Sequence, residues 1–258
     1  MQKGLSAAGA ADVEVPAIRS VHRLSGLEHW VPWRIKLLVQ SIVWRSPLLY
    51  FFYGGLRSNR GVYDRDFDLA VEGFPRSGNT YARKMFEHTN RDKIRIRSHG
   101  HRPPFVLAAL QLAKPVALLV RKPLDAAVSW HIYTGLPLEY ILNQYILYHR
   151  ILLPFRKNLL IIQFGDLVEK PFAHQLERIE ERFKLGLRTK IDEEQLRTLV
   201  VAEIHQTCTS DVGTIDVFRV NVPNNVRATV KETIVTKALT SRTLAHALTV
   251  ADCIHDKF

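Results

Sequence analysis

Cysteine is nearly absent from this sequence, which contains Cys208 and Cys253 and no others. Disulfide-rich scaffolds and structural zinc sites need clustered cysteines, so the sequence disfavours both classes. A reducing compartment is the simpler interpretation, and we expect the two thiols to be small buried side chains.

The sequence also lacks a long uninterrupted apolar run. In its most aromatic part, residues 30 to 53, several cations interrupt the apolar residues and Pro47 breaks any single long helix, so we expect no membrane span. Residues 1 to 15 lack the apolar core of a signal peptide, and their acidic side chains argue against a transit peptide. We therefore expect a cytoplasmic protein.

Two interpretations of residues 30 to 53 remain open. This region holds Trp30, Trp33 and Trp44 among aliphatic residues and the cations Arg34, Lys36 and Arg45. Such a mixture suits a helix lying in a membrane interface. The same mixture suits a helix that covers the core of its own domain, with basic side chains extending to solvent. Peripheral membrane contact through this region is therefore one of two expectations.

Negative charge is in deficit, since the chain carries a formal net charge of +11. Such a surface attracts phosphate, sulfate, nucleic acid or anionic lipid. The basic residues are spread along the chain and no nucleic-acid motif is present, so we expect no nucleic-acid partner. We expect a flexible N-terminus over residues 1 to 25 and one domain over residues 26 to 258, including an aromatic, basic helical region at 30 to 56.

Strand and helix patterns alternate along the middle of the chain. Short apolar runs predict strands at 67–73, 93–99, 115–121 and 159–164. Helices are predicted at 79–88, 103–112, 123–134, 138–153, 171–183 and 193–205. This alternation predicts an α/β fold, with a central parallel sheet flanked by helices and ligands bound at the carboxyl ends of its strands. Residues 213–227 are the least regular segment, which we interpret as a lid or a surface loop.

Residues 73–80, GFPRSGNT, match a phosphate-binding loop at both glycines and at the terminal hydroxyl, but Asn79 replaces the lysine. Between a strand and a helix, such a loop directs backbone N–H groups and the helix N-terminus at an anion. ATPases and GTPases also need the lysine and a strand-end aspartate for Mg²⁺. Here one apolar strand ends in Arg121, and the other reaches Asp166 only after Gly165. We therefore expect an anion site and no metal.

Four segments, in order between Val71 and Pro171, resemble the sulfotransferase family. They are VEGFPRSGNTYAR at 71–83, IRSHGH at 96–101, LLVRKPLDAAVSWH at 118–131 and IIQFGDLVEKP at 161–171. The resemblance implies 3′-phosphoadenosine 5′-phosphosulfate (PAPS) as the sulfuryl donor, with no metal and a P-loop-like phosphosulfate loop. It implies an acceptor hydroxyl on a small alcohol or phenol, a lipid or a carbohydrate.

The resemblance also implies roles for single residues. Arg76 would contact the oxygen that bridges sulfur and phosphorus, and His99 would be the catalytic base, with His101 in reserve. A histidine with a pKa near neutral suits proton removal from the acceptor. Arg121 and Ser129 would bind the 3′-phosphate.

Other positions follow from the same resemblance. The 5′ group would be held by four loop residues, Ser77, Gly78, Asn79 and Thr80. Tyr81 would stack on adenine, with Phe164 near it. The family's late R-K-G triplet is missing, so Arg219 or Arg227 would take its place. The aromatic residues Trp130, Tyr133, Tyr140 and Tyr145 are candidates for lining an acceptor pocket.

Two other functions remain open from the sequence. A nucleotide-dependent kinase with a degenerate phosphate loop would need a magnesium-binding carboxylate that is not evident. A nucleotide-binding module without catalysis would suit the basic charge. The sequence leaves the acceptor and the oligomeric state open.

Overall fold

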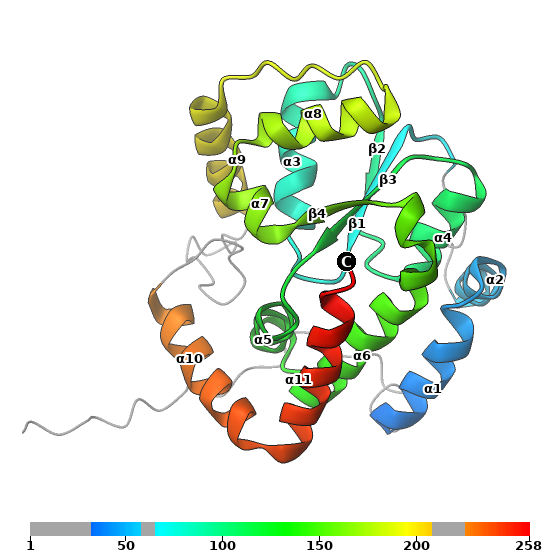
Figure 1. The fold of residues 1–258 in the computed structure, drawn as a ribbon, viewed down its shortest axis with the longest axis vertical. Coiled ribbons are helices and arrows are strands. Elements are labelled where there is room, and N and C mark those ends of the chain that lie inside the picture. Colours follow the sequence, from blue (N-terminus) through cyan, green and yellow to red (C-terminus); the bar gives the residue numbers. More distant parts are fainter. Residues whose placement is uncertain (1–31, 58–64, 208–224) are drawn as a thin grey trace, which may run out of the picture.

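We analysed a computed structural model that describes residues 32–57, 65–207 and 225–258. The predicted N-terminus at residues 1–25, Cys208 and Arg219 lie outside these ranges. Within them, the expected α/β class is confirmed, because a parallel sheet has helices on both faces (Figure 1).

The sheet has four strands in the order β2-β1-β3-β4, all parallel. The strands are β1 (Leu69–Gly73), β2 (Ile96–Ser98), β3 (Val116–Val120) and β4 (Leu160–Gln163). Each lies within a predicted strand. The predicted strands were one to three residues too long at every end except Gly73. At two of these ends the cause is visible, because His99 leaves the extended region at φ 73° and Phe164 begins a helix.

Alternate strand residues divide the core into two layers. Ala70 and Leu118 face one layer, whereas Val71 and Leu119 face the other. This alternation follows from strand geometry, in which successive side chains point to opposite faces. Both faces are buried, which explains why the strands read as continuous apolar runs rather than alternating ones.

Helices from different parts of the chain cover the two faces (Figure 1). The face of Ala70 is covered mainly by α4 (Pro103–Gln111), α5 (Pro123–Thr134), α6 (Leu138–Leu152), α10 (Asn225–Thr240) and α11 (Arg242–His255). The face of Val71 is covered mainly by α3 (Asn79–Asn90), α8 (Phe172–Phe183) and α9 (Glu193–Thr207). Two short elements flank β4 in the chain. The 3₁₀ helix η1 (Leu153–Asn158) precedes this strand, and α7 (Phe164–Glu169) follows it.

Local sequence signals explain where α5 starts and stops. Pro123 occupies its first turn, where a missing N–H costs nothing, and Gly135 caps its end at φ 71°. The predicted range 123–134 is therefore confirmed.

The aromatic region forms two helices, α1 (Trp33–Val43) and α2 (Pro47–Arg57), separated at Pro47 as predicted. α1 contacts α6 and α2 contacts α4. Across the described ranges, we find no helix with the length and apolar character that a bilayer crossing requires.

Helices α10 and α11 were not predicted from the sequence. α11 packs on α5 and α6, where Ala247, Ala251 and Ile254 join the core. The expectation of buried thiols was wrong for Cys253, which is exposed on α11. Its neighbours Ala251 and Ile254 occupy the inward positions of the helix, which leaves residue 253 outside.

Candidate functional site

The four segments that carry the predicted site follow the four strands. Gly73 ends β1 and opens the loop, while His99, Arg121 and Phe164 come directly after β2, β3 and β4. Because all four strands are parallel, their carboxyl ends lie at one edge of the sheet. The order β2-β1-β3-β4 therefore places the loop between His99 on one side and Arg121 on the other.

The loop between β1 and α3 is held by Asn79, the residue that replaces the lysine. Its Nδ2 donates to the carbonyl oxygens of Gly73 (3.4 Å) and Phe74 (3.3 Å), and the side chain is buried. Asn79 therefore braces the loop from beneath, a role that the sequence comparison with phosphate loops did not indicate.

Gly78 ends the loop in a conformation that favours glycine. It is the residue before α3 and has φ 93°, in the left-handed region. A Cβ at this position would lie 2.9 Å from Leu167 Cδ2 and 3.1 Å from Phe164 Cδ2. Phe164 thus packs against the loop, at the N-terminus of α3, whose first turn has no acidic residue.

A buried aromatic cluster anchors the start of the loop. The ring of Phe74 meets those of Trp130, Tyr145 and Tyr148 edge to face, with centroids 5.1, 5.1 and 5.7 Å away. Tyr145 is fully buried, and its hydroxyl donates to the carbonyl oxygen of Arg121 at 2.8 Å. Tyr145 therefore supports the site from below. The expectation that it lines an acceptor pocket was wrong, because aromatic packing removes it from the surface.

The predicted pocket residue Tyr140 is also buried, in the first turn of α6. Its hydroxyl accepts hydrogen bonds from Gln144 Nε2 (2.8 Å) and Gln40 Nε2 (3.3 Å). It joins α1 to α6 and does not line an open pocket. Tyr133 is different, since its half-buried ring lies under the guanidinium of Arg76, with 5.1 Å from Cζ to the ring centroid.

Arg76 contacts both residues that were predicted to bind the 3′-phosphate, Ser129 and Arg121. Its Nε donates to Ser129 Oγ on α5 at 3.1 Å, and its carbonyl oxygen accepts from Arg121 Nη1 at 2.8 Å. The Arg121 guanidinium lies over the Phe164 ring, 4.1 Å from its centroid. The structure therefore brings together residues from three segments that the sequence treated separately.

His99 lies on the other side of the loop. Its Nε2 shares a hydrogen bond of 3.2 Å with Thr80 Oγ1, in the first turn of α3. His101 is close to it, with ring centroids 5.4 Å apart, and its Nδ1 is 3.1 Å from the Gly73 carbonyl oxygen. Both histidines contact the loop region, but only the His99 ring bonds a predicted ligand-binding side chain.

The turn that carries the two histidines is held by Glu72, which the sequence analysis missed. Its carboxylate accepts from Gly100 N (3.1 and 3.0 Å to the two oxygens) and from His101 N (3.2 Å). His99 and His101 both have positive φ, 73° and 51°, an uncommon conformation that concentrates at functional sites. A glutamate inside an otherwise apolar strand was the signal that could have identified this support.

Burial shifts the pKa of the two histidines in this turn and of Glu72, which holds the turn from β1. Desolvation lowers the pKa of His99 to about 4, with smaller effects from His101 and Arg83. Desolvation also lowers the pKa of His101, and it raises that of Glu72 to about 7 against the opposing backbone hydrogen bonds. The expected near-neutral pKa for His99 was therefore wrong in this state, and its imidazole is neutral at pH 7.

The remaining predicted residues are the loop residue Ser77 and three residues outside the loop, Tyr81, Arg219 and Arg227. Tyr81 is half-buried on α3, where it packs against the core of the Val71 face. Arg227 lies in the first turn of α10, and its side chain is outside the described part of the structure, as is all of Arg219. Ser77 is buried, and its Oγ has no hydrogen-bond partner within the described residues.

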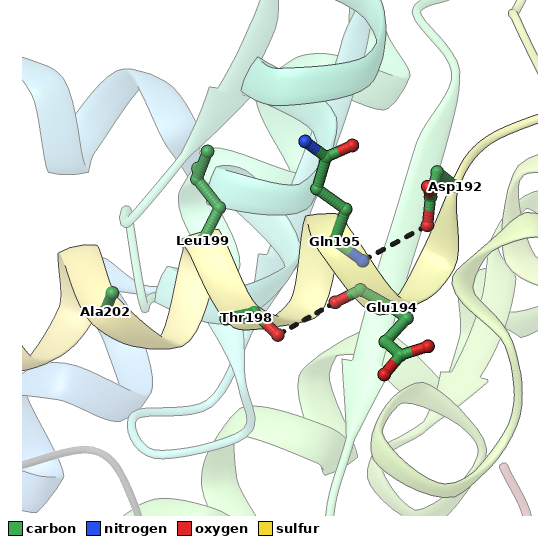
Figure 2. Close-up of a pocket in the computed structure, with 6 residues that line it drawn as sticks. All are labelled: Asp192, Glu194, Gln195, Thr198, Leu199 and Ala202. Atoms are coloured by element: carbon green, nitrogen blue, oxygen red, sulfur yellow. Dashed lines mark hydrogen bonds between the residues drawn. The ribbon is translucent and has the colours of Figure 1, made fainter.

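A surface pocket lies elsewhere, along α9 (Figure 2). Its lining residues are Asp192, Glu194, Gln195, Thr198, Leu199 and Ala202. Their polar groups are used locally, since Gln195 N donates to Asp192 and Thr198 Oγ1 donates to the Glu194 carbonyl oxygen. Two carboxylates oppose an anionic ligand, and we assign this pocket no role. In the described ranges, no group of three or more His, Cys, Asp or Glu residues is arranged to hold a metal ion.

Comparisons with known proteins add little to this geometry. No protein-family model matches the chain, and no curated protein matches its sequence. Among solved structures, the crystal structure of mouse sulfotransferase SULT7A1 complexed with PAP overlaps it with a TM-score of 0.45 and 16% identity, covering 75% of this chain and 89% of that one. A likeness this loose carries no functional argument.

Proposed function

We propose that this chain is a sulfotransferase that moves a sulfuryl group from PAPS to an acceptor hydroxyl without a metal. The observation that carries the proposal is the meeting of four motif segments at one sheet edge, with Arg76 bonded to Ser129 and Arg121, and Thr80 bonded to His99. The proposed domain comprises residues 26 to 258. The scarcity of cysteine supports a reducing, cytoplasmic setting.

On the donor side, the loop residues and the N-terminus of α3 would hold the 5′-phosphosulfate. Ser77 supports this assignment, because its buried Oγ lacks a partner among the described residues and can serve a ligand. Backbone N–H groups at Gly78, Asn79 and Thr80 would add to the positive helix end. PAPS would supply an activated sulfuryl group on a phosphate leaving group.

Two arginines would stabilise negative charge during transfer. Arg76 would neutralise the leaving phosphate, and Arg121 with Ser129 would hold the 3′-phosphate. The bonds from Arg76 Nε to Ser129 and from Arg121 Nη1 to the Arg76 carbonyl oxygen link the residues proposed for the two phosphates. Tyr81 and Phe164 would flank the adenine, and Arg219 or Arg227 would close over the nucleotide.

On the acceptor side, His99 would take the hydroxyl proton as the new S–O bond forms and the bond to the leaving phosphate oxygen breaks. Its lowered pKa keeps it neutral at pH 7, the state needed to accept a proton. Bound anionic groups beside it would raise its basicity, because an opposite charge favours the imidazolium. His101, which contacts the loop backbone, would position this turn.

Ligand-induced stabilisation tests the donor site. We expect 3′-phosphoadenosine 5′-phosphate to raise the melting temperature in EDTA, by several degrees at a hundredfold excess over Kd, where stabilisation is about 2.7 kcal/mol. ATP with Mg²⁺ should do much less. The opposite ranking would support a kinase and overturn the proposal.

Transfer itself needs a second assay. Purified protein and labelled PAPS are mixed with cell extract, and sulfated products are separated by mass. We expect label to enter a hydroxyl compound, and the Arg76→Ala variant to lose this activity while the exposed control Arg150→Ala keeps it. Nucleotide binding without any transfer would instead identify a non-catalytic binding module.

A further inference from the structure

The outward side of helices α1 and α2 is apolar and open to solvent. Its seven residues, which we call the outer face, have exposed fractions of 48% to 81%. They are Ile35, Leu38, Val39, Ile42, Leu48, Leu49 and Phe52. The four on α1 are spaced at i, i+3, i+4 and i+7, which is the pattern of a single helical stripe. Such a stripe normally faces a core, but here the core lies on the opposite side.

The inward side of the same helices is firmly docked on the domain. Gln40 Oε1 accepts from Gln144 Nε2 at 3.1 Å, and Trp44 is 5% exposed within the core. On α2, the rings of Tyr50 and Phe51 meet that of Phe105, with centroids 5.6 and 5.4 Å away. These contacts fix the two helices on the domain, and none of them involves a residue of the outer face.

The charged residues within α1, α2 and the turn between them are all cations. Residues 32 to 57 contain no aspartate or glutamate, and they include Arg34, Lys36, Arg45 and Arg57. Arg34 on α1 and Arg45 in the turn between α1 and α2 are both exposed. Apolar side chains flanked by cations, without acids, are complementary to a surface that has an acyl interior and anionic headgroups.

The length of α1 and α2 determines whether they could cross a membrane or lie along its surface. α1 and α2 have 11 residues each. A helix of that length spans about 16 Å, far less than the roughly 30 Å of a bilayer core. The two helices can therefore lie in the plane of the interface, with the outer face toward the acyl chains and the arginines at headgroup level.

We propose that the outer face binds an anionic lipid surface and attaches the protein peripherally to a membrane. The apolar side chains supply burial and the arginines supply attraction to the headgroups. The interpretation of residues 30 to 53 as a cover for their own core accounts for Trp44, but it leaves the seven exposed residues unexplained. This proposal does not depend on the sulfotransferase assignment.

Sedimentation with vesicles tests the proposal on the full chain. We expect the protein to sediment with phosphatidylcholine vesicles containing phosphatidylserine, and at least about tenfold less with phosphatidylcholine alone. Leu38→Ser with Leu48→Ser should lower binding about tenfold or more, as should Arg34→Glu with Arg45→Glu.

Matched variants test whether vesicle binding depends on the outer face itself or on any exposed apolar or basic residue. Leu199→Ser with Leu239→Ser removes two exposed leucines from α9 and α10, and should leave vesicle binding unchanged. Lys184→Glu with Lys190→Glu removes two exposed cations between α8 and α9, and should change binding less than twofold. Melting curves of all four variants check that each is folded.

Two results would overturn the proposal. One is equal loss of binding in the matched variants, which would indicate attraction without a defined surface. The other is no binding to the phosphatidylserine vesicles. In that case, sedimentation velocity tests whether the protein forms a dimer that Leu38→Ser with Leu48→Ser dissociates. Such a dimer would assign the outer face to a second copy of this chain.

Discussion

At the scale of single residues, His99 combines a hydrogen bond to the loop with a lowered pKa. Thr80 Oγ1 is 3.2 Å from its Nε2, and burial keeps the ring neutral at pH 7. A neutral imidazole next to the proposed donor site can accept a proton but contributes little charge to anion binding. Its proposed role therefore belongs to transfer and not to nucleotide affinity.

Replacing His99 with alanine tests that separation. We expect His99→Ala to lower the transfer rate by about a hundredfold or more, the usual contribution of a general base. The Kd for 3′-phosphoadenosine 5′-phosphate, measured by calorimetry, should change less than about threefold. The exposed His174→Ala on α8 is the control and should behave as the unmodified protein. A large loss of nucleotide affinity in His99→Ala would make His99 a structural residue.

Glu72 is the second residue whose surroundings determine its chemistry. It is 1% exposed, and its carboxylate holds the backbone of Gly100 and His101. Burial outweighs those hydrogen bonds and raises its pKa from 4.5 to about 7. The folded protein therefore binds this proton more tightly than the unfolded chain does.

That difference predicts how stability depends on pH. A raised carboxyl pKa stabilises the fold below about pH 4.5, and this contribution is lost as pH rises through about 7, by up to about 3 kcal/mol. Glu72→Gln cannot ionise, so the stability of the unmodified protein relative to this variant should fall between pH 4.5 and 7.5. Urea unfolding at several pH values measures the trend. The exposed Glu181→Gln should show none, and a flat difference for Glu72→Gln would contradict the prediction.

At the scale of elements, the connection from β2 to α4 depends on close packing. Gly100 separates the two histidines, and a Cβ added there would lie 2.4 Å from Phe105 Cγ. Phe105 in turn meets Tyr50 and Phe51 of α2. The turn that carries His99 is thus packed between the sheet edge and the N-terminal helices.

A single methyl group at Gly100 should disturb this packing. We expect Gly100→Ala to destabilise the protein by about 1–3 kcal/mol, the usual cost of overpacking, and to reduce transfer by displacing His99. Gly165→Ala is the matched control, because its added Cβ would meet only Glu169 Oε1, at 3.8 Å. Thermal unfolding and the transfer assay measure both effects. Equal stability of the two variants would show that Phe105 moves aside at no cost.

The elements also show where sequence patterns were sufficient. The four strands and six central helices carry local signals, such as the apolar run of β3 and Pro123 at the start of α5. α10 and α11 were not predicted, and the predicted irregular segment at 213–227 was too long, because residues 225–227 begin α10 and the rest lies outside the described residues. Their stability comes from packing on α5 and α6, which depends on tertiary structure that a local pattern does not report.

At the scale of the whole molecule, the chain has a formal net charge of +11, and its proposed ligand is a polyanion. Long-range attraction of this kind accelerates encounter more than it strengthens the final complex. Salt screens it, with a Debye length of about 8 Å at physiological ionic strength.

Association kinetics should therefore respond strongly to salt. Between about 0.01 and 0.5 M NaCl, we expect the association rate of 3′-phosphoadenosine 5′-phosphate, measured by stopped flow, to fall about tenfold or more. The dissociation rate should change much less. Adenosine, which has no charge, is the control ligand. An effect confined to dissociation would indicate that contacts in the site, and not the whole surface, carry the salt dependence.

The sequence by itself determined the α/β class, the positions of the strands and the loop between β1 and α3. These features follow from apolar runs, prolines and glycines that act within a few residues of each other. The identity of Arg76, His99 and Arg121 as candidates also came from the sequence, and their proposed roles stay predictions. No long-range contact was needed for any of these inferences.

Only the tertiary structure decided how those candidates meet. The strand order places the loop between His99 and Arg121, the Arg76 side chain reaches Ser129, and Glu72 holds the turn at Gly100. The lowered pKa of His99 and the open outer face of α1 and α2 also arise from burial or exposure in the folded chain. Their physical cause is packing between residues far apart in sequence, which sets solvent access and hydrogen-bond partners.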